Sequence, residues 1–378
     1  MRRSYLDHNA TTPLDPEVLA VMTAVLSEDY GNPSSIHWFG QRARAVVEQA
    51  RESVARLVGA RASDVVFTAS GTEADNMALC GVCAAAGGRS RRILYAAIEH
   101  HAVIHCARSL AEEGWSVAPV RVDGRGRLDL DHLSTCLAEP TALVAVMLAN
   151  NETGVIQPLD DVVRLAHAKG ALVLCDAVQA AGKIEIDTAA LGVDLLTLSA
   201  HKLYGPKGVG ALWIRHGTPL KALVHGGGQE RHRRAGTENV AGIAGFGRAA
   251  SLARERLSAD ATHLRDLREA LDKELLAITG AQRNGEEPRL PNTTNVSFEG
   301  VEAESLVLAL DLAGVAVASG AACSSGSIEP SHVLRAMRLP PARVRGALRF
   351  SLGRHNTTAD ISQAAVAVRE AVARQRTR

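Results

Sequence analysis

The stretch LLTLSAHK, residues 195–202, is a short apolar run that ends in polar side chains. Its first part has the length and composition of a buried β-strand. Ser199, His201 and Lys202 lie where the chain would leave that strand. Because α/β proteins bind ligands just beyond the carboxyl ends of their strands, this stretch predicts a strand that leads into a functional site.

More runs of the same kind occur on both sides of this stretch. They are DVVFTA at 64–69, RILYAA at 92–97, LVAVML at 143–148, ALVLC at 171–175 and VGALWI at 209–214. Helical patterns lie between several of them, for example at 42–57 and 158–169. Strands that alternate with helices predict an α/β fold with a mostly parallel central sheet sandwiched by helices.

Polar residues also follow most of these other runs. They are SGTE at 70–73, EHH at 99–101, NNETG at 150–154, and Asp176 with Gln179 behind it. Parallel strands end at the same edge of a sheet, so we expect these side chains to gather in one place.

The last third of the chain predicts a second, smaller domain. The chain has 378 residues, more than the roughly 250–300 that one hydrophobic core usually serves. A long helical pattern at 240–278 leads into expected strands at 294–298 and 315–318 and expected helices at 305–312 and 358–373. We therefore predict an N-terminal segment at 1–15 associated with the small domain, a large ligand-binding domain at 16–250, and a small α+β domain at 251–378.

Charge and composition exclude several classes of protein. The formal net charge is +1 with both signs interspersed, which predicts neither a nucleic-acid partner nor a membrane surface. No apolar run reaches the roughly 18 residues of a membrane span, and no apolar signal core follows the first residues, so we expect a cytoplasmic protein. Free thiols are then expected for the six cysteines, and core packing for the Cys-x-x-Cys motif of Cys80 and Cys83.

Lys202 and Asp176 together favour pyridoxal phosphate as a cofactor. A lysine amine in a partly desolvated site forms a Schiff base with an aldehyde cofactor, and a carboxylate against the pyridine nitrogen keeps the ring protonated. Gln179 could hydrogen-bond the phenolic oxygen. Taken singly these residues have ordinary explanations, since most lysines lie at the surface and aspartate is common in turns.

The other strand ends supply candidates for phosphate and ring contacts. Gly71 and Thr72 would open a helix whose first amides bind phosphate, although a plain helix cap explains Thr72 by itself. Ser199 and His201 could add phosphate contacts. His100 could stack on the ring and move protons, although a lone histidine is more often structural.

Two candidates for substrate chemistry lie in the last third. Cys323 is in SGAACSSG at 319–326, whose glycines and small residues predict a mobile loop that brings a thiol to a bound substrate. Arg349, helped by Asn151, could grip a carboxylate with paired hydrogen bonds. His101 and His105 have metal-ligand spacing, but no second ligand cluster accompanies them, so we predict no metal site.

Several motifs in order resemble the cysteine desulfurases of the nitrogen-fixation and iron–sulfur-cluster type, within the class V aminotransferase group. The resemblance covers nearly the whole chain. It is carried by YLDHNATTP at 5–13, GNPSS at 31–35, NNETG at 150–154, SAHK at 199–202, RAGTEN at 234–239, the Cys323 loop and Arg349.

This resemblance implies a fold-type-I pyridoxal-phosphate sulfurtransferase that works as a homodimer and converts L-cysteine to L-alanine. It also implies roles for individual residues: Lys202 as the cofactor lysine, Asp176, Gln179 and His100 as ring contacts, Thr72, Ser199 and His201 as phosphate ligands, Thr237 as a phosphate contact from the other subunit, Asn151 and Arg349 as carboxylate contacts, and Cys323 as the nucleophile that carries a persulfide.

Other readings stay open at this point. A selenocysteine lyase or an aminotransferase would use the same scaffold, although an aminotransferase needs no thiol. A non-enzymatic iron–sulfur or metal scaffold is disfavoured because the cysteines form no cluster-binding pattern. The sulfur acceptor could be an iron–sulfur scaffold, a tRNA-thiolation protein or a simple reductant, and Cys323 could transiently contact an iron–sulfur cluster.

Overall fold

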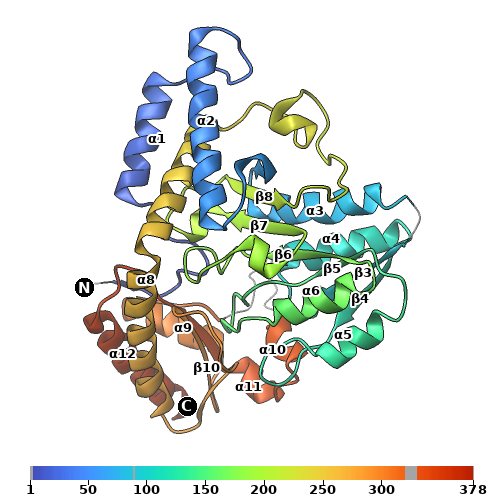
Figure 1. Ribbon diagram of the computed structural model, residues 1–378. Coiled ribbons are helices and arrows are strands. Elements are labelled where there is room, and N and C mark those ends of the chain that lie inside the picture. The colour runs from blue at the N-terminus through green and yellow to red at the C-terminus, as the bar shows by residue number, and fades with distance from the viewer. Residues whose placement is uncertain (1–2, 88–89, 320–329, 378) are drawn as a thin grey trace.

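A seven-stranded sheet forms the centre of the computed structural model (Figure 1), which describes residues 3–87, 90–319 and 330–377. β8 runs antiparallel to both of its neighbours, and the other neighbouring pairs are parallel. The predicted α/β class with a mostly parallel sheet is therefore confirmed. In spatial order the strands are β2 (Val65–Thr68), β8 (Gly210–Ile214), β7 (Leu195–Ser199), β6 (Leu172–Asp176), β5 (Leu143–Ala145), β3 (Arg92–Ala96) and β4 (Ser116–Val120).

Within the seven-stranded sheet, the predicted strands differ from the observed ones at two places. The run 143–148 is a ladder strand only over β5, but Val146 and Leu148 still donate backbone hydrogen bonds to the carbonyls of Leu174 and Asp176. β4 was not predicted, because it is a partly exposed edge strand that contains Pro119 and lacks the apolar pattern of a central strand.

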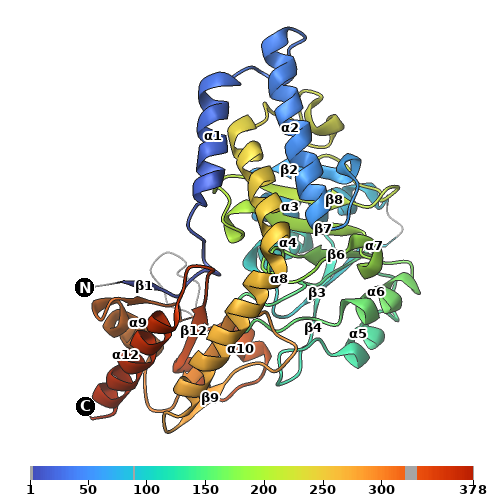
Figure 2. The ribbon, with the colours of Figure 1, turned by 60° about the vertical axis from the view of Figure 1, so that its left-hand side comes forward.

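The sheet is buried on both faces, which explains its continuous apolar runs. Along β7, Leu195 packs into one core, whereas Leu196 and Leu198 pack into the core on the opposite face. Helices cover both faces (Figure 1 and Figure 2). One layer contains α3 (Gly71–Ala85) and α4 (His101–Glu112), and the other contains α2 (Trp38–Leu57), α6 (Leu159–His167) and the first half of α8 (Val240–Leu276).

A second core lies beside a smaller antiparallel sheet, near both chain ends (Figure 1). That sheet has the order β12 (Ala347–Ser351), β10 (Thr293–Phe298), β9 (Ala281–Arg283), and β1 (Ser4–Tyr5) pairs in parallel with β11 (Val315–Ala316). Around this core lie α9 (Ala303–Leu312), α12 (Thr358–Arg376) and the second half of α8. The remaining helices are α1 (Pro16–Glu28), α5 (Leu130–Cys136), α7 (Thr188–Leu191), α10 (His332–Ala336) and α11 (Pro341–Arg345), with short turns η1 (Ala62–Asp64), η2 (Ala200–Lys202) and η3 (Gln229–His232).

The long helix α8 connects the two cores. Phe246 belongs to the core of the large sheet, whereas Leu264 and Leu271 belong to the second core, which also includes Leu6. The predicted boundary at residue 250 falls inside this unbroken helix. The division into 1–15, 16–250 and 251–378 stays a prediction, and the two cores are the observation that favours it.

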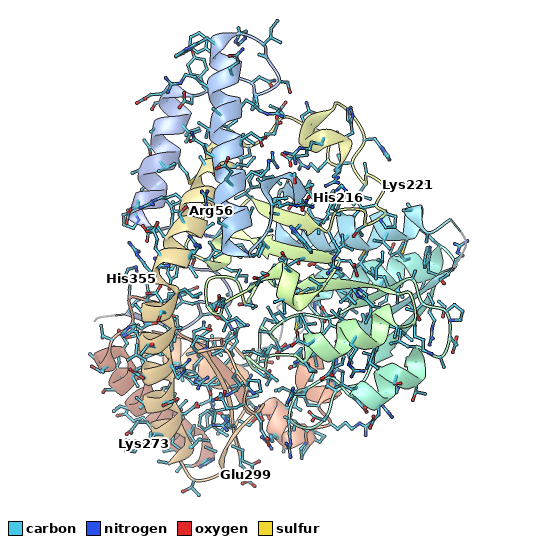
Figure 3. The ribbon with its side chains drawn as sticks, viewed as in Figure 1. Arg56, His216, Lys221, Lys273, Glu299 and His355 are labelled. Atoms are coloured by element: carbon cyan, nitrogen blue, oxygen red, sulfur yellow. The ribbon has the colours of Figure 1, made fainter. Side chains whose placement is uncertain are left out.

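Charged side chains of both signs are spread over the surface. Exposed examples are Arg56, Lys273 and Glu299, which Figure 3 labels at distant points of the molecule. Across the described chain, each helix is too short or too polar to span a lipid bilayer.

Candidate active site

A cavity of about 380 Å³ lies where the carboxyl ends of β6 and β7 meet the starts of α3 and α4. The fold therefore gathers the polar strand ends in one place, as their spacing predicts. The predicted site residues that line this cavity are Gly71, Thr72, His100, Asn151, Asp176, Gln179, Ser199, His201, Lys202 and Arg349.

Two predicted site residues are not placed in this cavity. Thr237 lies elsewhere, among the residues that line two other cavities near Glu238 and Asn239. Cys323 is outside the described residues.

Lys202 presents its amine to the cavity from η2, directly after β7. Its Nζ donates hydrogen bonds to the backbone oxygens of Asn9 and Ala10, the latter at 2.8 Å. Burial, together with the positive charge of Arg349, lowers the pKa of Lys202 to about 8. A lysine with such a pKa has a usable fraction of neutral, nucleophilic amine near neutral pH.

Asp176 is the last residue of β6 and lies among other buried carboxyl groups. Its Oδ1 accepts a hydrogen bond from the Val178 amide at 2.9 Å, and burial raises its pKa. Burial and the charge of Asp176 also raise the pKa of Asp75 and of Glu99 well above the usual range. Asp75 Oδ1 and Glu99 Oε2 have no hydrogen-bond partner among the described residues. A cationic or proton-donating group would therefore be stabilised here.

The start of α3 approaches the ends of β6 and β7 closely. A Cβ atom at Gly71 would lie 2.9 Å from Val178 Cγ2 and 3.4 Å from Ser199 Cβ, so glycine permits this approach. Ser70 caps the helix by accepting a hydrogen bond from the Glu73 amide. The first amides of a helix attract anions, so this end of the cavity suits a phosphate group.

His100 is the N-cap residue of α4. Its Nδ1 accepts a hydrogen bond from the Ala102 amide at 3.1 Å, which leaves the ring proton on Nε2. Burial lowers the pKa of His100. The imidazole is therefore neutral near neutral pH and can donate only through Nε2.

In the described part of the chain, no group of three or more His, Cys, Asp or Glu side chains could hold a metal ion.

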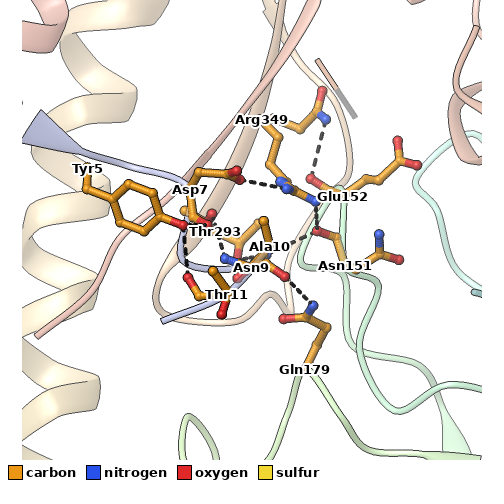
Figure 4. Close-up of polar contacts among 12 residues, drawn as sticks. Tyr5, Asp7, Asn9, Ala10, Thr11, Asn151, Glu152, Gln179, Thr293 and Arg349 are labelled. Atoms are coloured by element: carbon orange, nitrogen blue, oxygen red, sulfur yellow. Dashed lines mark hydrogen bonds and ion pairs between the residues drawn. The ribbon is translucent and has the colours of Figure 1, made fainter. Parts of the chain in front are cut away.

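The N-terminal segment lines the cavity through Asn9, whose contacts with Asn151 and Gln179 are drawn in Figure 4. The backbone oxygen of Asn9 accepts from Gln179 Nε2 at 2.9 Å as well as from Lys202. Its side chain donates to the Asn151 backbone oxygen and to Thr293 Oγ1. Sequence reasoning did not select Asn9, because its contacts join segments that are distant in the sequence; its place in the YLDHNATTP motif was the one available signal.

Arg349 projects into the cavity from β12 in the second region of the molecule. Its Nη2 lies 2.7 Å from Asp7 Oδ1, and its Nη1 donates to the Asn151 backbone oxygen at 3.2 Å (Figure 4). Its buried Nε has no partner among the described residues, so the guanidinium keeps a donor for an incoming anion.

Glu152 is a further cavity residue that sequence reasoning missed. Burial raises its pKa to about 7, and its Oε2 accepts a hydrogen bond from Ser331 Oγ at 2.5 Å. The sequence shows Glu152 only as part of NNETG, and its burial appears only in the fold.

The chain belongs to the class-V aminotransferase family, whose sequence profile matches residues 4–364. It is similar to several proteins that are named cysteine desulfurase. It is 45% identical, over 96% of its length and 92% of the relative, to a protein of Dictyoglomus turgidum named cysteine desulfurase IscS.

Two solved structures have the same fold. A NifS-like protein superposes with a TM-score of 0.92 at 41% identity, over 97% of this chain and 98% of that chain. A structure titled SspA in complex with cysteine superposes with a TM-score of 0.83 at 30% identity, over 93% of this chain and 99% of that chain.

Proposed function

We propose that this chain is a pyridoxal-phosphate-dependent cysteine desulfurase, which converts L-cysteine to L-alanine and leaves a persulfide on Cys323. The observation that carries the proposal is the buried amine of Lys202 in one cavity with Asp176 and Arg349. Similarity to proteins named cysteine desulfurase, and to a protein whose structure contains cysteine, supports the substrate.

The cavity residues fit pyridoxal phosphate. The buried Asp176 carboxylate would accept a hydrogen bond from a protonated ring nitrogen, and His100 would lie against the ring. Gln179 would bind the phenolic oxygen. The closely packed start of α3, with Gly71 and Thr72, would hold the phosphate together with Ser199 and His201. When bound, the cofactor supplies an aldehyde that condenses with amines and a cationic ring that withdraws electrons from the substrate α-carbon.

The residues of the chain then have separate tasks. Arg349 and Asn151 hold the substrate carboxylate through charge-assisted and amide hydrogen bonds. The neutral amine of Lys202 takes the α-proton, and the charge of Asp176 keeps the ring nitrogen protonated. His100, neutral and protonated on Nε2, relays protons within the cavity.

Cys323 completes the sulfur transfer. Its thiolate bonds to the sulfur of L-cysteine as the carbon–sulfur bond breaks, because the thiolate is the nucleophilic form. The balance is one enzyme thiol plus L-cysteine, giving one enzyme persulfide plus L-alanine. We propose that this sulfur then passes to an iron–sulfur scaffold or to another acceptor protein.

We also propose a homodimer in which Thr237 of the partner subunit binds the phosphate. In support, Thr237 lies away from the cavity of its own subunit. A Thr237→Val change should then weaken cofactor binding in the dimer.

The direct test supplies L-cysteine without any keto acid and measures both products. We expect alanine to form and the tryptic peptide 290–335, which contains Cys323 and no other cysteine, to gain one sulfur atom. Cys323→Ser should keep the absorbance of the bound cofactor and lose both products. Alanine formation by Cys323→Ser at the wild-type rate, or an absolute need for a keto acid, would contradict the proposal.

A further inference from the structure

Cysteines that the proposed reaction does not use meet between α3 and α4. Cys80 lies on α3 and Cys106 on α4, and their Sγ atoms are 3.6 Å apart. Cys83 lies one turn further along α3. The sequence predicts core packing for Cys80 and Cys83, but the contact of Cys80 is with a thiol on the neighbouring helix.

The two thiols differ in access and in acidity. Cys80 is partly exposed and lines a second cavity of about 540 Å³, whereas Cys106 is 6% exposed and does not line it. The hydrogen bond between the two thiols lowers the pKa of Cys80, and the same contact, with burial, raises the pKa of Cys106. Of these two thiols, a reagent in this cavity therefore meets Cys80 first, and Cys80 is the more easily ionised. Cys83 lines the same cavity, but burial raises its pKa to about 12.

We propose that Cys80 and Cys106 form an oxidisable thiol pair, a modification site that a peroxide converts to a disulfide between α3 and α4. The separation of 3.6 Å exceeds a disulfide bond of about 2.05 Å, so the two side chains must rotate toward each other for the bond to form.

The reaction with hydrogen peroxide balances in two steps. The Cys80 thiolate attacks one peroxide oxygen, the oxygen–oxygen bond breaks, and hydroxide leaves a sulfenic acid on Cys80. The Cys106 sulfur then attacks the Cys80 sulfur, the disulfide bond forms, and the hydroxyl leaves as water with the Cys106 proton. The two thiols lose two electrons in total, and the peroxide becomes two water molecules.

The position of the pair connects it to the active cavity. α3 begins at Gly71 and α4 follows its N-cap His100, and both of these residues line that cavity. A disulfide between Cys80 and Cys106 would link the two helices at points one to three turns beyond these starts. Formation of this disulfide would therefore constrain the relative positions of the two helix starts that line the active cavity.

The test uses the holoenzyme, treated with hydrogen peroxide in excess over total thiol, then alkylated and digested with trypsin without reduction. Tryptic peptides 62–89 and 93–108 should appear joined, with fragmentation placing the bond at Cys80 and Cys106, and dithiothreitol should separate them. Because this readout is a mass, it does not depend on desulfurase activity.

Matched variants locate the bond. Cys80→Ser and Cys106→Ser should each abolish the joined peptide, whereas Cys83→Ser, one turn away on the same helix, should keep it. Recovery of the two wild-type peptides unjoined, or a bond that maps to Cys83, would overturn the proposal.

Discussion

The two walls of the active cavity differ in whether their buried charged groups are held in a close ion pair. The wall from the large sheet holds Asp176, Lys202 and His100, whose pKa values shift mainly because burial penalises their charged forms. The wall from the N-terminal segment and β12 holds Arg349, paired with Asp7 at 2.7 Å. A buried group that forms no close ion pair is neutralised more easily than an ion-paired group, which keeps its charge. The first wall therefore suits proton transfer and the second suits anion binding.

The largest expected effect comes from the proton-transfer wall. Lys202→Ala removes the amine that holds the cofactor and moves the α-proton, so we expect kcat for alanine formation to fall by about 10³-fold or more. The matched control is Lys221→Ala, an exposed lysine (Figure 3) that does not line the cavity, and this variant should keep the wild-type rate. A residual rate within tenfold of wild type would show that Lys202 is not the central base.

Borohydride reduction gives an independent check on that residue. Lys183 is a second buried lysine, whose pKa burial lowers to about 7, but it does not line the cavity. Peptide mapping after reduction should find the cofactor on Lys202 and not on Lys183. Labelling of Lys183 would show that the cofactor attaches outside the cavity.

A smaller effect is expected on the anion-binding wall. Arg349→Ala removes charge-assisted hydrogen bonds to the substrate carboxylate, which are worth about 1.5–3 kcal/mol. KM for L-cysteine should therefore rise about 10- to 100-fold, with a smaller change in kcat. Arg349→Lys should recover part of the loss. A change confined to kcat would place Arg349 in the chemical step instead.

Charged groups on the two walls should also shift the pKa of Lys202 in opposite directions. The rate at which pyridoxal phosphate attaches to the apoprotein requires a neutral amine. It should rise about tenfold per pH unit below pH 8 and level off above the Lys202 pKa of about 8. Asp176→Asn removes a charge that raises this pKa and should shift the inflection to lower pH. Arg349→Ala removes one that lowers it and should shift the inflection to higher pH. Equal inflections in the three proteins would contradict this account.

The smallest expected effect concerns the competition for Arg349. Asp7→Asn keeps a hydrogen-bond acceptor beside the guanidinium but removes the negative charge that competes with the substrate carboxylate. We expect KM for L-cysteine to fall by about threefold, within the modest range of partly buried ion pairs. Thermal unfolding should shift to lower temperature, because a buried arginine loses its charged partner. A higher KM would mean that Asp7 mainly positions Arg349.

Sequence reasoning identified ten of the residues that line the cavity, for an identifiable reason. β6 and β7 are buried on both faces, so they read as apolar runs, and the residues behind them had to lie at the sheet edge. This placed Asp176, Ser199 and Lys202 without any tertiary information. It failed for β4, whose exposure at the sheet edge removed the apolar pattern.

Residues whose importance depends on distant contacts could not be found in that way. Asp75 reads as an ordinary helix residue, and only the fold buries it beside Asp176. In the sequence Asn9 is only one residue of the YLDHNATTP motif, and only the fold brings it against Gln179 and Lys202.

The amino-acid order by itself determined the central strands of the large sheet, the class of fold and the strand-end residues, because burial periodicity and edge polarity are local properties. Tertiary structure alone decided that Asp7 faces Arg349 and that Cys80 meets Cys106. It also decided that carboxyl groups gather around Asp176. Charge pairing and pKa depend on distances between segments that are far apart in the chain, and packing sets those distances.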